Sequence, residues 1–113
     1  TKAGAGGLTL SATNTYSGAT TVSAGTLTVS GGDAISTNSS VSVASGATLA
    51  LSVNETIGNL SGAGAITLGT NTLTTTQTAD TTFSGDISGT GGLTVNQSGA
   101  ATFALTLSGN NTY

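Results

Sequence analysis

The sequence predicts an all-β protein, a parallel β-helix (β-solenoid) of about five coils, from three observations. First, its 113 residues include 25 Thr, 15 Ser, 18 Gly, 15 Ala and 8 Asn, and Thr favours pleated strands whereas Gly and Asn supply turns. Second, Gly is repeatedly followed by a short alternation of apolar residues with Thr or Ser. Third, these alternations recur roughly every 20 residues, a period typical of stacked coils.

Each alternating run is predicted as a short strand because Gly, Asn, Ser or Asp bounds it. In chain order the predicted strands are residues 7–10, 20–22, 25–29, 41–43, 46–51, 57–60, 64–68, 92–95 and 102–103. A β-sandwich needs longer strands, hairpin turns and more aromatic residues than the two Tyr and two Phe present. Small residues with Leu, Val and Ile are enough to fill the narrow column inside a β-helix.

The alternation also predicts which side chains face the core, because successive residues of a strand point to opposite faces. The residues predicted to point into one continuous column are Leu8, Leu10, Leu27, Val29, Leu49, Leu51, Ile66, Leu68, Leu93, Val95, Leu105 and Leu107. The residues predicted to point outward are Thr9, Thr28, Thr67, Thr94 and Thr106. A slip of one residue would expose every apolar group, so we expect this register to be well defined.

Composition excludes most site chemistry. The chain has no Cys and no His, which excludes nearly every zinc, haem, iron–sulfur, thiol or Ser-His site. Lys2 is the single Lys or Arg, so we expect no binding of nucleic acid or anionic lipid. No apolar run approaches the ~20 residues of a membrane helix, and we expect no membrane insertion by this segment. Residues 1–7 lack the apolar stretch of a signal peptide and read as the interior of a longer repetitive chain.

The two ends of the chain carry the same motif. Residues 8–16 (LTLSATNTY) align with residues 105–113 (LTLSGNNTY), with seven of nine positions identical. Shared composition would produce a few Thr or Ser matches, but not Leu, Asn and Tyr in the same order. We therefore expect residues 1–113 to form a single solenoid segment of a longer repetitive chain, open at both ends. The repeat motif of residues 4–29 starts again near residues 99–113.

Residues 4–29 (GAGGLTLSATNTYSGATTVSAGTLTV) resemble the autotransporter-associated β-strand repeat. The sequence departs from that pattern at Ala12, where Gly is more usual and where the second copy has Gly109. The resemblance implies a right-handed parallel β-helix in the secreted passenger of a large Gram-negative surface protein. It also implies a signal peptide and a C-terminal outer-membrane β-barrel elsewhere in the full-length protein. The expected location is therefore the cell surface or the extracellular space.

The candidate site residues all have a structural interpretation that we prefer. Gly4–Gly7 and Gly89–Gly92 lack the Lys and the following helix of a phosphate-binding loop, and are predicted as corner turns. The four carboxylates are predicted as solvated turn residues rather than an acid pair for glycan cleavage, and a calcium site at two of them lacks the β-roll nonapeptide. These carboxylates are Asp33, Glu55, Asp80 and Asp86.

The tyrosines and the glycosylation-like triplets have similar alternatives. Tyr16 and Tyr113 occupy equivalent repeat positions; they suit either a carbohydrate-stacking platform or, as we prefer, packing at a corner beside Asn. The Asn-x-Ser/Thr triplets are expected by chance in a Ser- and Thr-rich chain; they begin at Asn38, Asn54, Asn59, Asn96 and Asn110. We predict no catalytic, cofactor-binding or metal-ligating residue and no cofactor.

The leading functional hypothesis is a non-enzymatic stalk or spacer of a bacterial adhesive surface protein. The alternative is a self-associating module that forms aggregates or filaments by solenoid stacking, and a polysaccharide lyase is a distant third. The expected partners are neighbouring repeat units or copies of the chain, with host or surface glycans as further candidates. With so few charges, we expect thermal stability to change little between about pH 4.5 and 9.

Overall fold

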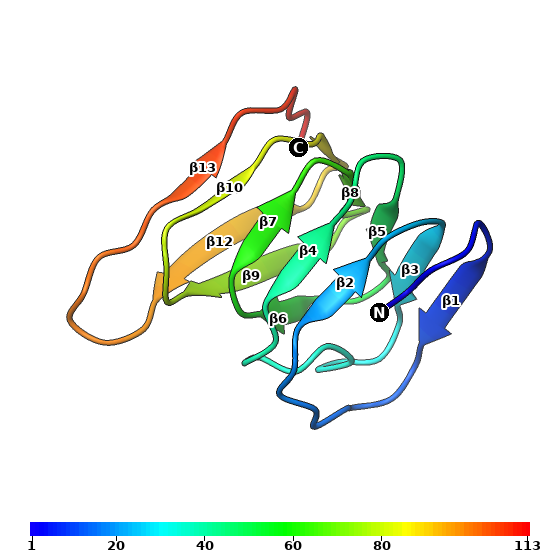
Figure 1. The fold of residues 1–113 in the computed structure, drawn as a ribbon, viewed down its shortest axis with the longest axis horizontal. Coiled ribbons are helices and arrows are strands. Elements are labelled where there is room, and N and C mark those ends of the chain that lie inside the picture. The colour runs from blue at the N-terminus through cyan, green and yellow to red at the C-terminus, as the bar shows by residue number, and fades with distance from the viewer.

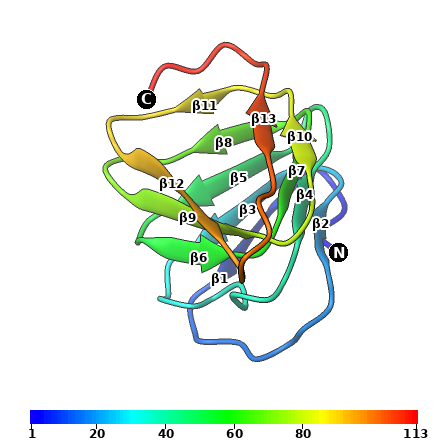
Figure 2. The same ribbon diagram turned by 90° about the vertical axis from the view of Figure 1, so that its left-hand side faces the viewer.

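The computed structural model describes residues 1–113 and contains 13 strands and no helix. All strands pair in parallel and form three sheets that wrap around one core (Figures 1 and 2). The first sheet contains β1 (Gly7–Leu10), β3 (Thr26–Val29), β5 (Thr48–Leu51), β8 (Ala65–Thr67) and β11 (Ile87–Ser88). The second contains β2 (Thr20–Val22), β4 (Val41–Val43), β7 (Leu60–Gly62), β10 (Thr81–Phe83) and β13 (Leu105–Leu107). The third contains β6 (Glu55–Ile57), β9 (Thr72–Gln77) and β12 (Gly92–Gln97).

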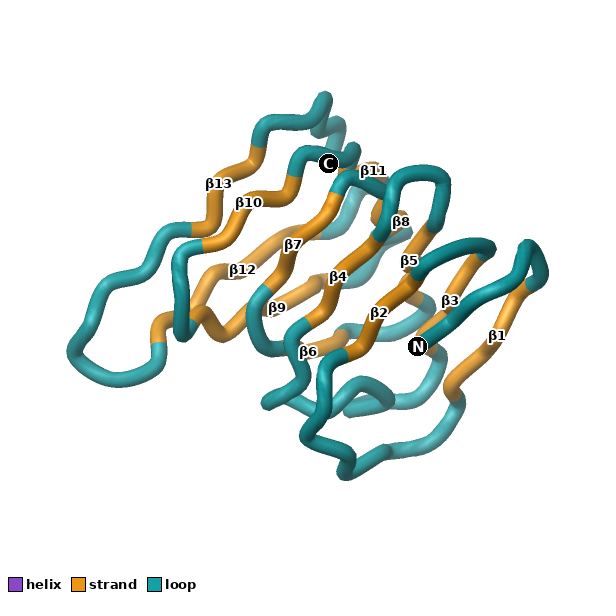
Figure 3. The backbone as a smooth tube through the Cα atoms, viewed as in Figure 1, coloured by secondary structure: helices purple, strands orange, loops and turns teal.

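The chain visits the three sheets in turn, so each circuit is one coil stacked on the coil before it. The coils β5–β6–β7, β8–β9–β10 and β11–β12–β13 each have three strands. The two preceding coils have no strand in the third sheet, and the loop of residues 30–40 lies between β3 and β4 (Figure 3). The first two sheets each have five strands, which confirms the predicted β-solenoid of about five coils.

The pairing register confirms the predicted core face. Leu8, Leu27, Leu49, Ile66 and Ile87 pair in succession across the first sheet. Their outward neighbours follow the same order, as when Thr9 pairs with Thr28 and Ala50 pairs with the exposed Thr67. The interior column is closely filled, because 17 buried apolar residues form a single cluster.

Two of the predicted core residues lie on the core face but are not buried. Leu8 is 44% exposed and Val95 is 43% exposed, although each pairs with a buried residue, Leu27 and Thr75 respectively. They belong to the first and last coils, which have a neighbouring coil on one side only. Leu10, Leu93, Leu105 and Leu107 are partly buried against the core, and the remaining predicted core residues are buried.

Several strand predictions were wrong in detail. Residues 57–60 do not form one strand, because Ile57 ends β6 and Leu60 begins β7 after a corner at Gly58. Residues 102–103 lie in a loop rather than in a strand. None of β9, β10 and β11 was predicted as a strand. The inward side of β9 carries Thr75 and Gln77, so its sequence shows no apolar alternation.

Glycine at the corners allows successive coils to approach closely. A Cβ on Gly85 would lie 1.6 Å from the carbonyl oxygen of Gly64, and one on Gly91 would lie 1.9 Å from the carbonyl oxygen of Asn71. Both obstacles are backbone atoms of the preceding coil. Gly85 and Gly91 are therefore required by the distance between coils, which is about 4.8 Å in a β-ladder.

The repeated motif occupies two different places in the solenoid. Residues 8–10 lie in β1 of the first sheet, whereas residues 105–107 form β13 of the second sheet. The local turn is nevertheless the same: Asn14 Nδ2 donates to the carbonyl of Ala12 at 3.1 Å, and Asn111 Nδ2 donates to that of Gly109 at 3.2 Å. The sequence repeat therefore preserves a local conformation and not a position around the axis.

Candidate functional site

Asn side chains connect successive coils by replacing missing backbone partners at the corners. Asn59 Oδ1 accepts hydrogen bonds from the backbone N–H groups of Thr78, at 2.8 Å, and Ala79, at 3.3 Å. Asn54 Oδ1 accepts one from the N–H of Thr72 at 2.8 Å. Asn71 Nδ2 donates to the carbonyl of Leu51 in the preceding coil at 3.2 Å.

Sequence reasoning missed this role of the asparagines. Two of them, Asn54 and Asn59, were explained only as chance glycosylation triplets. Their positions in the sequence carry the signal. Each lies at the end of a strand, and another turn lies about one coil length away. Asx side chains in such turns commonly bond to nearby backbone groups.

Two of the four carboxylates also connect coils. Asp80 Oδ1 accepts a hydrogen bond from the N–H of Ala104, and Asp86 Oδ1 accepts one from the N–H of Asn110, each at 2.8 Å. Both side chains are exposed and lie in turns, as predicted. Asp33 is also exposed in a turn, with a φ of 55°, in the left-handed region that Asp tolerates better than most residues.

Glu55 corrects the prediction that all four carboxylates are solvated. It is only 3% exposed and points inward from β6. Its Oε1 accepts a hydrogen bond from the N–H of Ile35 at 3.0 Å, and its Oε2 accepts one from the N–H of Ala34 at 3.3 Å. These N–H groups belong to the loop that runs where a third-sheet strand is missing, so the carboxylate supplies acceptors that a strand would otherwise supply.

The electrostatics of Glu55 follow from this burial. Desolvation raises the pKa of its carboxyl above the ordinary value, the two backbone hydrogen bonds oppose that increase, and the negative charge of Asp33 adds to it. Asp33 is the only other titratable group that influences it. Since both carboxylate oxygens are engaged by backbone donors, Glu55 is a structural acceptor.

Lys2, the single basic residue, has a comparable structural role. Its side chain is buried, and its ammonium donates to the carbonyl oxygens of Ala3, Gly4 and Ala24 at 2.9, 2.8 and 3.1 Å. Three carbonyls around one ammonium hold the Gly4 turn, where φ is 78°, against the neighbouring coil. This turn matches the corner predicted for Gly4–Gly7, and Gly89, with φ of 124°, does the same for Gly89–Gly92.

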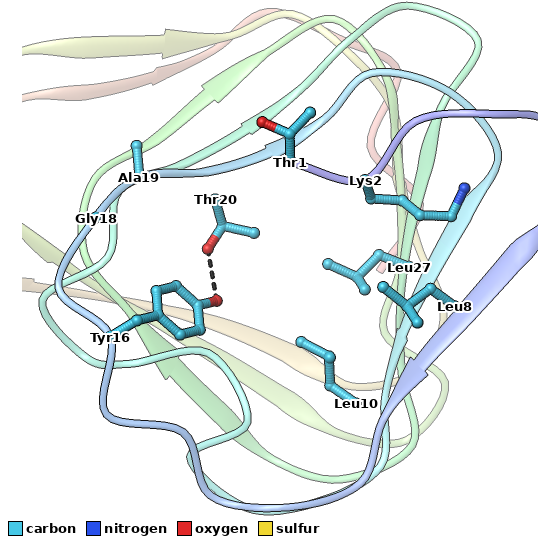
Figure 4. Close-up of a pocket in the computed structure, with 9 residues that line it drawn as sticks. All are labelled: Thr1, Lys2, Leu8, Leu10, Tyr16, Gly18, Ala19, Thr20 and Leu27. Carbon is cyan, nitrogen blue, oxygen red and sulfur yellow. Dashed lines mark hydrogen bonds between the residues drawn. The ribbon is translucent and has the colours of Figure 1, made fainter.

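The structure does not bring the two tyrosines together. Tyr16 lies in the first coil, where its hydroxyl and that of Thr20 share a hydrogen bond of 2.7 Å (Figure 4). Tyr113 is the last residue and is 44% exposed. A stacking platform made of both rings is therefore excluded. The ring of Tyr16 instead forms part of the wall of a pocket at the end of the solenoid.

The structure has two hollows. One, of about 320 Å³, is the open end of the core at the first coil and is lined by Leu8, Leu10, Tyr16 and Leu27 among others (Figure 4). The other, of about 310 Å³, is a groove along the corners that precede β5, β8 and β11, and Asp86 lies at its edge. No group of three or more His, Cys, Asp or Glu residues is arranged to hold a metal ion. The structure contains no helix long and apolar enough to span a membrane.

The first part of the chain is similar to a known family. Residues 1–29 match the family model described as passenger-associated-transport-repeat. The matched residues comprise β1, β2 and β3 with their corners. Searches of curated proteins and of solved structures gave no match. The match covers 29 of the 113 residues.

Proposed function

We propose that the chain is a non-enzymatic stalk or spacer within an adhesive passenger. Two findings support this: residues 1–29 match the passenger-associated-transport-repeat model, and the chain folds as a β-solenoid. Each coil adds about 4.8 Å along the axis. Its mechanism is extension: stacked coils hold a recognition element of the passenger away from the cell surface. Adhesion then comes from that element or from many copies acting together.

One observation carries this proposal: the charged side chains of the chain mostly serve the scaffold. Lys2, Glu55, Asp80 and Asp86 each bond to backbone groups of another turn or coil. A catalytic or binding site keeps such groups free to contact a ligand. Here they hold adjacent coils in register, as the side chain of Asn59 also does. Four of the five charged side chains thus bond to the backbone of the chain itself.

Replacement in the full-length passenger tests the proposal. Residues 1–113 would be exchanged for an unrelated β-solenoid of five coils, and cell adhesion and surface display would be measured. A spacer predicts that both are retained, because only length and stiffness matter. A matched control replaces the same residues by a flexible Gly/Ser linker, which is expected to keep display and to lower adhesion. Loss of adhesion in the solenoid exchange, with normal display, would show that these residues themselves recognise a ligand.

A further inference from the structure

We draw no further inference here: the strongest candidate, the groove of about 310 Å³ along the corners that precede β5, β8 and β11, is lined almost entirely by Gly, Ala, Ser and Thr, and nothing in the structure shows what would occupy it.

Discussion

Replacing Gly85 by Ala tests whether coil spacing depends on glycine at the corners. An ideal Cβ at this position lies 1.6 Å from the carbonyl oxygen of Gly64 and 2.9 Å from the carbonyl carbon of Ala63. Gly85 does not have a positive φ, so the substitution adds a steric conflict and no backbone strain. The obstacle is backbone, and the coils on either side are fixed by ladder hydrogen bonds such as Ser84 N–H to the carbonyl of Gly62 at 2.8 Å.

The expected cost is large for a single methyl group. Overpacking in well-ordered interiors costs about 1–3 kcal/mol, and here the upper value applies because two coils must separate locally. A loss of about 3 kcal/mol is a large fraction of the ~5–15 kcal/mol typical of a folded domain. With a urea m-value of about 1–3 kcal/mol/M, the unfolding midpoint is expected to fall by about 1 M or more.

Urea unfolding followed by circular dichroism measures this effect, at a low protein concentration so that association does not contribute. Gly18→Ala is the matched control, since a Cβ there meets nothing within 4 Å and φ is not positive. It is expected to leave stability within about 0.5 kcal/mol of the wild type. If Gly85→Ala were as stable as Gly18→Ala, the coils would not be packed as closely as described, and the reasoning would be refuted.

Three further outcomes are expected from buried and bridging polar groups. Thr75→Val removes a hydroxyl that is fully buried without a hydrogen-bond partner, so it is expected to stabilise the fold by about 1 kcal/mol; a lower thermal midpoint would contradict this. Burial raises the pKa of Glu55 in the folded state, so the folded state binds that proton more tightly than the unfolded state. Its contribution to stability is therefore full below the unfolded pKa and is lost as pH rises through the folded value. Comparing the urea midpoints of the wild type and Glu55→Gln from pH 4 upward isolates this contribution. The wild-type midpoint is expected to fall relative to that of Glu55→Gln as pH rises, and a relative rise would contradict the prediction. Asn59→Ala removes the acceptor of two backbone N–H groups and is expected to cost about 1–2 kcal/mol in urea unfolding, whereas Asn38→Ala, in an exposed turn, is expected to cost little.

The alternation of apolar and small polar residues was enough to predict the β-solenoid and its core register. Each run such as Thr26–Val29 has only one register that buries its apolar side chains, and that register is observed. The same rule also contained the signal for Glu55, because it precedes Ile57 by two residues and therefore shares its inward face. It was missed because the predicted strand began at Ile57 and left Glu55 outside it.

Other features could not be predicted from the alternation, because they depend on contacts with neighbouring coils. Strand β9 buries Thr75 and Gln77 where an apolar residue would be expected, and its pairing with β6 and β12 on both edges compensates for this. The bridging asparagines depend on which turn lies in the adjacent coil. The exposure of Leu8 and Val95 depends on position along the axis, whereas periodicity gives only the face on which each residue lies.

The ladder hydrogen bonds join each coil to the next, and this direction has a mechanical consequence. Tension along the solenoid pulls on the junctions one after another, in series, so the weakest junction yields first. The first two coils have no strand in the third sheet. The loop of residues 30–40 takes its place, and it is joined to the following coil by scattered hydrogen bonds, among them those to the carboxylate of Glu55 and the one from the Gly58 N–H to the carbonyl of Ser39, rather than by a ladder. Under a pulling force the solenoid is therefore expected to open from its N-terminal coils, while the three-stranded coils from β5 onward stay closed.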